Sequence, residues 1–410
     1  MVRSIALAYR DAYGGLSKEI WILSIALLVN RCGSMVLAFL TLYLTTKLGF
    51  TMPQAGAIFA VYGLGSVAGS YLGGRLVRPV GAVRLQIIAQ LVSVPLYLLV
   101  PVFTSWIGVG ISVFLLSVFV ECVRPANNVA VTQFTSPELH TRAFGLQRMA
   151  VNLGFSIGPA IGGVLAEIDF VWLYVFDGVT TGLGAAVLIW FFGFQKYTKK
   201  GDLAEKQKLA ESNGNTGSPL ADPLFVIFLF LLLMVSIVFF QFHATVPKYL
   251  EDHFGMSKPE IGLLFSVNTL IIVVFEMLLL NFVKRFSMLR IIGWGSLLAC
   301  VGFGIMPLSQ TIWFAYLSMV IVTVGEMLLF PLATGFSAHR SEGRDSGMYM
   351  GWFAMTFSVA CIIAPLLGTA IYDFNRDLLW YCCLGVGLFT LAGFFWLARH
   401  QTWKPKQEAE

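Results

Sequence analysis

Apolar runs of about 20 residues recur along the whole chain, which is the length that a helix needs to cross a hydrocarbon core about 30 Å thick. Short polar stretches separate these runs. We expect an all-α membrane protein in which each run forms a transmembrane helix. The expected spans are 20–45, 54–74, 85–103, 106–131, 143–166, 170–193, 223–247, 261–281, 291–309, 311–335, 346–371 and 377–398.

Composition supports a membrane protein and argues against several other classes. Hydrophobic residues make up 57% of the chain and charged residues 12%, about half the charged fraction of a soluble domain. The six cysteines all fall inside apolar runs without metal-ligand spacing, so we interpret them as packing residues. The sequence contains no nucleotide-binding loop, catalytic triad or metal-ligand set. We therefore expect neither an enzyme nor a bound metal or cofactor.

The placement of lysine and arginine predicts the orientation in the membrane. Three of the 27 basic residues lie inside the expected spans, and four lie in loops on one side: Lys47, Lys248, Lys258 and Arg376. The other 20 lie on the opposite side together with both termini. This asymmetry predicts cytoplasmic termini and an even number of spans. It also accounts for the net charge of +5 without a nucleic-acid partner.

One long polar stretch divides the chain almost in half. Residues 194–222 are rich in Lys, Glu, Gly, Ser and Asn and have too little apolar content to build a core. We expect an N-terminal six-helix bundle over 1–193, a cytoplasmic linker over 194–222, a C-terminal bundle over 223–400 and a cytoplasmic tail over 401–410. The first 18 residues are expected to form a short amphipathic segment at the cytoplasmic surface.

The two halves match each other at a constant offset of 206 residues. Glycine and proline positions carry the match: Gly49, Pro53, Gly56, Pro125, Gly145, Pro159 and Gly162 correspond to Gly255, Pro259, Gly262, Pro331, Gly351, Pro365 and Gly368. A single gapless register over five helices indicates an internal duplication. Because six is an even number, both copies begin on the same side of the membrane. Parallel six-helix repeats are a transporter architecture with a solute site between the halves.

The segment Gly73-Gly74-Arg75-Leu76-Val77-Arg78-Pro79-Val80-Gly81 resembles the G-G-x-L-x-D-R-x-G loop of the major facilitator superfamily. Arg78 and Pro79 stand where that pattern has Asp and Arg. The resemblance implies the major facilitator fold of twelve helices in two pseudo-twofold bundles. It also implies a gating loop, to which we assign Arg75, Arg78 and Arg84.

Two further segments resemble the bacterial drug/proton antiporters of that superfamily. They are the stretch from Arg124 to Gly163, with RPANN and TRAFGLQRMAVNLGFSIGPAIGG, and VTVGEMLLFP in the tenth expected span. This resemblance implies proton-coupled efflux of small organic molecules across the bacterial plasma (inner) membrane. The antiporters' arginine early in the fourth span has no counterpart in ISVFLLSVF.

Seven charged residues lie inside the expected spans, at a cost on the order of 20 kcal/mol if all faced lipid. They should face a polar cavity or one another. They are Arg31, Glu121, Arg124, Arg148, Asp177, Glu276 and Glu326. Arg31, beside Asn30, lies near the membrane midplane and would hold an anionic substrate group or tune a carboxylate; a structural ion pair is the alternative.

The fourth span carries Glu121, Arg124 and Asn128 on one helical face. Glu121 and Arg124 can pair within the helix. The cluster would line a cavity or gate, or would brace neighbouring helices.

Two carboxylates of the second half are candidates for substrate binding or proton coupling. Glu326 lies in the middle of the tenth span and Glu276 nearer the cytoplasmic end of the eighth. A carboxylate in a dry setting can hold a proton near neutral pH. Asp177, near the outer end of the sixth span, is expected to be a structural partner.

Three weaker candidates complete the set. Arg148 and Asn152 share a face of the fifth span, where Arg148 could form a gate pair with a carboxylate of the other half. His243 in the seventh span is either a proton relay or, more ordinarily, a hydrogen-bonded packing residue.

Three functions remain open from the sequence. The first is a proton-driven exporter of amphipathic small molecules. The second is a proton-coupled importer of peptides or related zwitterions, because Arg124-Pro125, Asn152-Leu153-Gly154 and Gly325-Glu326 faintly resemble the peptide transporters. The third is a lipid flippase or a receptor on the same scaffold. In each case we expect a monomer in the lipid bilayer, with a small-molecule substrate and protons as partners.

Overall fold

The computed structural model describes residues 14–136, 139–193, 218–341, 344 and 346–400. Most of the predicted linker, the tail over 401–410 and most of the expected amphipathic N-terminal segment lie outside the described residues. The domain boundaries therefore remain predictions. Twelve helices in the described part of the chain are long and apolar enough to cross a membrane, which confirms the predicted all-α class and number of spans.

The contacts within the chain define two compact units. The first unit contains the helices before the linker and also the residues Gly255–Val273. Its elements are α2 (Lys18–Cys32), α3 (Val36–Leu42), the π-helical turn η1 (Tyr43–Lys47), α4 (Met52–Val80), α5 (Ala82–Leu99), η2 (Val100–Val102), α6 (Trp106–Gln133), α7 (His140–Ile168), α8 (Val171–Phe192) and the start of α13 (Lys258–Val283).

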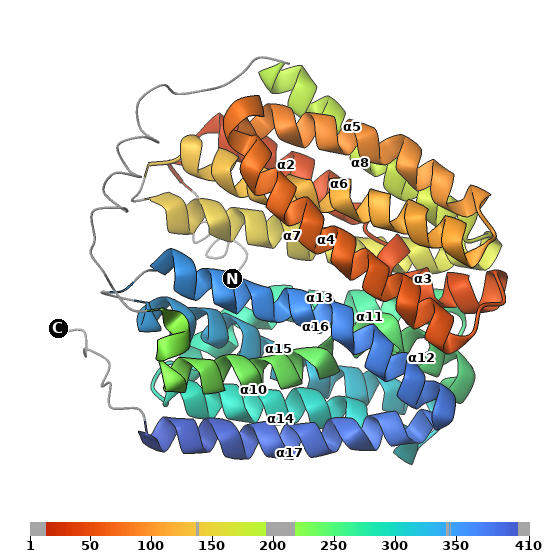
Figure 1. The fold of residues 1–410 in the computed structure, drawn as a ribbon, viewed down its shortest axis with the longest axis vertical. Coiled ribbons are helices and arrows are strands. Elements are labelled where there is room, and N and C mark those ends of the chain that lie inside the picture. The colour runs from red at the N-terminus through yellow and green to blue at the C-terminus, as the bar shows by residue number, and fades with distance from the viewer. Residues whose placement is uncertain (1–13, 137–138, 194–217, 342–343, 345, 401–410) are drawn as a thin grey trace, which may run out of the picture. The chain divides into compact units, whose positions relative to one another are not determined.

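The second unit contains the rest of α13 and the remaining helices. They are η4 (Pro219–Ala221), α10 (Pro223–Phe239), α11 (Gln241–Ala244), α12 (Val246–Phe254), α14 (Met288–Gly304), η5 (Met306–Leu308), α15 (Ile312–Arg340), α16 (Ser346–Phe374) and α17 (Arg376–His400). Figure 1 shows the helices of each unit lying roughly along one another.

The predicted repeat recurs in local backbone detail. Gly49 and Gly255 both adopt positive φ angles, 70° and 64°, a conformation that glycine reaches without steric cost. Two residues later in each half a hydroxyl residue caps the next helix. Thr51 forms a capping box with Gln54, and in the same register the backbone and side chain of Ser257 both bond the carboxylate of Glu260.

Helix pairing inside each unit follows the same register. In the first unit α2 packs against α7 and α8, and α5 packs against α6 and α8. In the second unit α10 packs against α16 and α17, and α14 packs against α15 and α17. Each helix pair of the first unit thus has a repeat-related pair in the second unit.

Small residues bring α4 and α6 together in the first unit. Added methyl groups at Gly65, Gly69 and Gly73 would overlap the backbone or side chains of α6. These glycines lie four residues apart, on one face of α4, as in other membrane helices that approach closely. The thiol of Cys122 donates to the carbonyl of Gly69 at 3.1 Å, in agreement with its predicted packing role.

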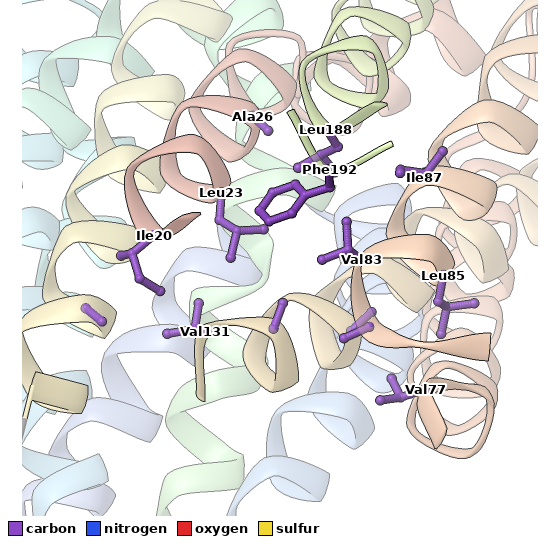
Figure 2. Packing of buried hydrophobic residues seen from close by; sticks show 14 of the residues in the cluster. Ile20, Leu23, Ala26, Val77, Val83, Leu85, Ile87, Val131, Leu188 and Phe192 are labelled. Carbon is purple, nitrogen blue, oxygen red and sulfur yellow. The ribbon is translucent and has the colours of Figure 1, made fainter. Parts of the chain in front are cut away.

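A buried apolar cluster closes one end of the first unit (Figure 2). Its members come from the start of α2, the end of α4, the start of α5, the ends of α6 and α8 and the start of α7. Starts and ends alternate because successive helices run in opposite directions. We call this end of a unit, where its first helix begins and its last helix ends, the proximal end, and the opposite end the distal end.

Candidate functional site

The first membrane helix is interrupted near its middle. α2 ends at Cys32, a turn occupies Gly33–Met35, and α3 begins at Val36. The predicted span over 20–45 is confirmed, since Lys18–Lys47 is long and apolar enough to cross the membrane, but its helix is interrupted rather than continuous. Glycine and serine together are a common cause of helix kinks, and Gly33-Ser34 stand at the interruption. We call residues 33–35 the first-helix break.

A glycine stripe on α7 lies against the first-helix break. Methyl groups added at Gly154, Gly158 and Gly162 would overlap Arg31, Cys32 and Met35 respectively. The glycines of the fifth span therefore serve close packing of helices. The stripe lets α7 run directly beside the break.

Asp177 of α8 holds the other side of the break. Its Oδ2 accepts a hydrogen bond from the Val36 N–H at 3.1 Å. Its Oδ1 lies 3.4 Å from the Met35 nitrogen, whose N–H also reaches the Gly33 carbonyl at 2.7 Å. The N–H groups of a first helical turn have no partner inside their own helix, and Asp177 supplies one for α3. The predicted structural partnership of Asp177 is therefore with backbone rather than with a basic side chain.

Arg31 and Asn30 precede the break on α2, and both are half-buried. Asn30 donates from Nδ2 to the hydroxyl of Thr181 on α8 at 3.1 Å. The Cζ atom of Arg31 lies 5.7 Å from the ring centre of Phe155, while its buried Nε has no hydrogen-bond partner. In the described part of the chain Arg31 forms no ion pair, so the expected mutual pairing of the buried charges does not extend to it.

Tyr97 of α5 connects these polar groups electrostatically. Its buried side chain interacts with the charges of Arg31, Asp177 and Glu121. The polar interior of the first unit is thus built from α2, α5, α6 and α8.

The fourth-span cluster is only partly buried. Arg124 Nη2 lies 2.9 Å from Glu121 Oε2, which confirms the predicted pairing within the helix, although the two groups are not aligned for a hydrogen bond. The Arg124 side chain is 63% exposed while that of Glu121 is 8% exposed. Asn128 is exposed as well.

Sequence reasoning missed the neighbouring residue Asn127, which is buried. Its Nδ2 donates to Gln147 Oε1 of α7 at 3.1 Å, and Gln147 Nε2 donates to Ser24 Oγ of α2 at 2.9 Å. This network joins three helices. A face assignment shifted one residue back along α6, from Asn128 to Asn127, would have included it.

The fifth-span candidates lie at different depths. Arg148 is exposed, and Asn152, one turn further, is half-buried. Arg148 interacts with another group, so it is not a free cation. A gate pair between Arg148 and a carboxylate of the other half stays a prediction.

The second unit has an interruption in the same register. α10 ends at Phe239 and α11 begins at Gln241, the repeat counterpart of Met35. Gln241 Nε2 donates to the Ala364 carbonyl of α16 at 2.7 Å and to that of Ile237 at 3.2 Å. Gly368, the counterpart of Gly162, leaves the space for the Gln241 side chain.

Three candidates lie on helices of the second unit. His243 on α11 is half-buried, and its Nδ1 is buried without a hydrogen-bond partner. Glu276 on α13 is 6% exposed, and Glu326 on α15 is half-buried. Both carboxylates interact with other groups.

The segment assigned as a gating loop is helical, which corrects the prediction. α4 continues to Val80, so Arg75 and Arg78 lie on its last turns, and Arg84 lies in the first turn of α5. Gly81, at φ +98°, makes the connection alone. All three arginines are exposed, and Arg75 covers the ring of Tyr71 at 4.8 Å. The helix continues beyond the apolar span because long basic side chains can extend to water from its end.

Ion pairs fix the ends of both units. At the distal end of the first, Lys47 bonds Asp169 at 2.5 Å, which lowers the pKa of Asp169. At the proximal end of the second, Arg340 bonds both oxygens of Asp222 at 2.7 Å, and Arg344 also bonds Asp222. Partial burial raises the pKa of Asp222, but the arginine hydrogen bonds outweigh it and lower the pKa to about 2.

Twelve apolar helices, repeated in two sets of six with polar side chains inside, define a polytopic membrane transporter. Comparison with known proteins identifies the family. The model of the major facilitator superfamily matches residues 23–257 and 242–410. The chain belongs to the major facilitator superfamily.

Two curated bacterial relatives are similar along most of their length. An uncharacterized MFS-type transporter, YttB of Bacillus subtilis (strain 168), is 24% identical over 86% of this chain and 88% of its own. The quinolone resistance protein NorA of Staphylococcus aureus is 24% identical over 91% of this chain and 95% of its own. These relatives are transporters and not enzymes.

Solved structures share the fold at lower identity. A peptide transporter POT in complex with sulfate superimposes with a TM-score of 0.78 at 17% identity, over 94% of this chain and 96% of that one. An inward-facing bacterial homolog of the human lysosomal transporter Spinster gives 0.75 at 13% identity, over 95% and 100%. The predicted major facilitator fold is confirmed.

Proposed function

We propose that this transporter is a proton-coupled exporter of a small organic solute, working by alternating access between its two six-helix halves, 1–193 and 223–400. The observation that carries the proposal is the similarity to a quinolone resistance protein along 91% of the chain. An exporter in this family needs an energy source, and the chain carries acidic side chains within its membrane helices that can exchange protons. One proton entering down 100 mV releases about 2.3 kcal/mol.

Glu326 is our candidate for the coupling carboxylate. It is half-buried in the middle of α15, among apolar residues of the sequence VGEMLLF. A carboxylate so placed favours its neutral form when it loses contact with water or with its partners. Alternating access would supply that change of surroundings. Asn30, Arg31, Glu121, Arg124, Asn128, Arg148, Asn152, His243 and Glu276 remain candidates for substrate binding or coupling.

Import of peptides or other zwitterions is the second candidate. It is favoured by Arg31, a half-buried guanidinium without an ion-pair partner in the described part of the chain, which could bind a substrate carboxylate. The solved peptide transporters that share the fold are compatible with this candidate.

A transport assay separates the two candidates. The full chain would be reconstituted in proteoliposomes with an imposed pH gradient and offered a fluoroquinolone, a lipophilic cation and a labelled dipeptide. Proton-driven extrusion of either of the first two supports export. Dipeptide uptake would support import instead, and movement of none of the three would contradict both candidates.

We predict that Glu326→Gln abolishes concentrative transport but leaves counterflow exchange of the same solute. The amide cannot release a proton, so the gradient can no longer drive the cycle, whereas exchange needs no net proton movement. Both rates would be measured in the same proteoliposomes. Asp373→Asn, which removes an exposed carboxylate of α16, is the matched control and should transport normally. Gradient-driven accumulation by the Glu326 variant would exclude this residue as the coupling site.

We further propose that the protein functions as a monomer in the bacterial plasma membrane, with both termini in the cytoplasm. The 20-to-4 distribution of basic residues between the two sides supports this orientation.

A further inference from the structure

We propose that Asp177 is a proton-binding site of the transport cycle and that its protonation loosens the first-helix break. The inference rests on the proposed proton coupling. Its main test does not measure transport, so the role of Asp177 and the proposed proton coupling can be disproved independently.

The contacts of Asp177 suit its ionised form. The side chain is 2% exposed, and both of its oxygens face backbone nitrogens at the start of α3. An ionised carboxylate is an acceptor only, whereas a protonated one carries a donor on one oxygen. Protonation would therefore remove the charge that strengthens the bond to the Val36 N–H.

No cation neutralises Asp177 in the described part of the chain. The titratable groups around it are the hydroxyls of Tyr97 on α5 and Tyr174 on its own helix, with Tyr43 of η1 against Tyr174. Arg31 on α2 interacts with Tyr97 but forms no ion pair with Asp177. A proton is thus the simplest means of neutralising this buried charge.

The second unit shows that such a break does not require a charge. There the uncharged amide of Gln241 bonds across to the Ala364 carbonyl, and the repeat counterpart of Asp177 is Cys383. Burying a carboxylate in a membrane protein is costly, and a neutral group suffices for the same architecture. The charged hold on the turn is therefore a feature of the first unit, where protonation of Asp177 can weaken it.

Loss of this bond would release one end of a defined segment. Three residues of 36–47 contact α8 or the residues before it. Val36 bonds Asp177, Tyr43 packs on Phe170 and Tyr174 with ring centres 5.9 and 5.2 Å apart, and Lys47 pairs with Asp169. The first of these lies at the break, where the backbone can pivot. Protonation would let residues 36–47 tilt about the break, while the Lys47–Asp169 ion pair still holds their distal end.

Hydrogen exchange of the full chain in lipid nanodiscs tests this inference. Protection of residues 34–42, corrected for the intrinsic exchange rate at each pH, should fall on acidification by about tenfold, the effect of weakening one charge-assisted hydrogen bond. Protection of α2 residues 20–29, before the break, should not change. No substrate or gradient is present.

Variants assign the response to Asp177. Asp177→Asn should show low protection over 34–42 at every pH. Asp177→Glu keeps an ionisable group and should retain a pH response with a shifted midpoint. Asp169→Asn, which removes the other carboxylate that holds this segment, and Glu326→Gln should both respond like the unaltered protein.

The inference is overturned if protection over 34–42 in the unaltered protein is independent of pH, or if Asp177→Asn keeps the normal response. If protection over 34–42 still depends on pH but transport does not depend on the pH gradient, the proposed proton coupling is wrong while the proton-binding role of Asp177 is supported.

Discussion

At the scale of single residues, the absence of a side chain decides how closely helices approach in the first unit. Gly154 lies beside Arg31, and a methyl group there would come within 2.5 Å of the Arg31 Cβ atom. Other glycines have open space around them. Gly385 of α17 has no heavy atom within 4 Å of an added methyl group. The same residue type thus has opposite consequences at different positions.

We predict that Gly154→Ala lowers the unfolding temperature of the purified protein by a few degrees, on the order expected for about 1–3 kcal/mol of overpacking. Gly385→Ala should leave it unchanged or raise it slightly, because alanine favours a helix over glycine. Thermal unfolding in detergent measures both. Equal effects of the two substitutions would contradict the close approach of α7 to the break.

At the scale of elements, the start of α10 is fastened to two other parts of the second unit. Asp222 caps α10 by accepting from the Phe225 N–H, and it also bonds Arg340 at the end of α15. Tyr349 of α16 donates to the same carboxylate at 3.2 Å. One side chain therefore fixes three helices at the proximal end.

We predict that Asp222→Asn lowers the unfolding temperature by several degrees at neutral pH, because Arg340 loses a bidentate partner. The pKa of Asp222, lowered from 3.8 to about 2, gives the pH dependence. Because the pKa is lower in the folded state, the ionised carboxylate stabilises the folded protein fully above pH 3.8. This stabilisation is lost as the pH falls through about 2. The difference between the two proteins should accordingly shrink between those values. Asp373→Asn is the control, and a difference that does not depend on pH would contradict the assignment.

At the scale of the whole molecule, the 206-residue repeat governs the architecture of each half. Capping residues, glycine turns, helix pairs and even the aromatic contact at the distal end recur. Tyr43 packs on Tyr174 in one unit, and Tyr249 packs on Trp380 at 4.9 Å in the same register. Function is expected where the copies differ, as at Arg31, Asp177 and Glu326.

We predict that single cysteines placed in a background without the six native ones report opposite sides of the membrane. Gln310→Cys, in the exposed turn before α15, should react with a membrane-impermeant thiol reagent added to intact cells. Ser287→Cys, in the exposed turn before α14, should react only after permeabilisation. The even number of spans and the excess of basic residues on one side are the reasons. The reverse labelling pattern would invert the proposed orientation.

The sequence by itself determined the twelve spans, the duplication, the family and the set of charged residues inside the membrane helices. These follow from local quantities: the length of apolar runs, the spacing of glycine and proline, and the cost of charge in lipid. It also identified the pairing of Glu121 with Arg124, because residues three apart on a helix are neighbours.

Only the tertiary structure decided that the first span is broken, that Asp177 rather than a basic side chain meets the break, and that Asn127 rather than Asn128 joins the buried network. It also showed that the glycine-rich segment after the second span is helix and not loop. Sequence patterns miss the partner of the break and the buried network because both depend on which polar groups of distant helices meet. The start of a helix after Gly33–Met35 needs an acceptor, and the residue that provides it lies 141 positions away from Val36.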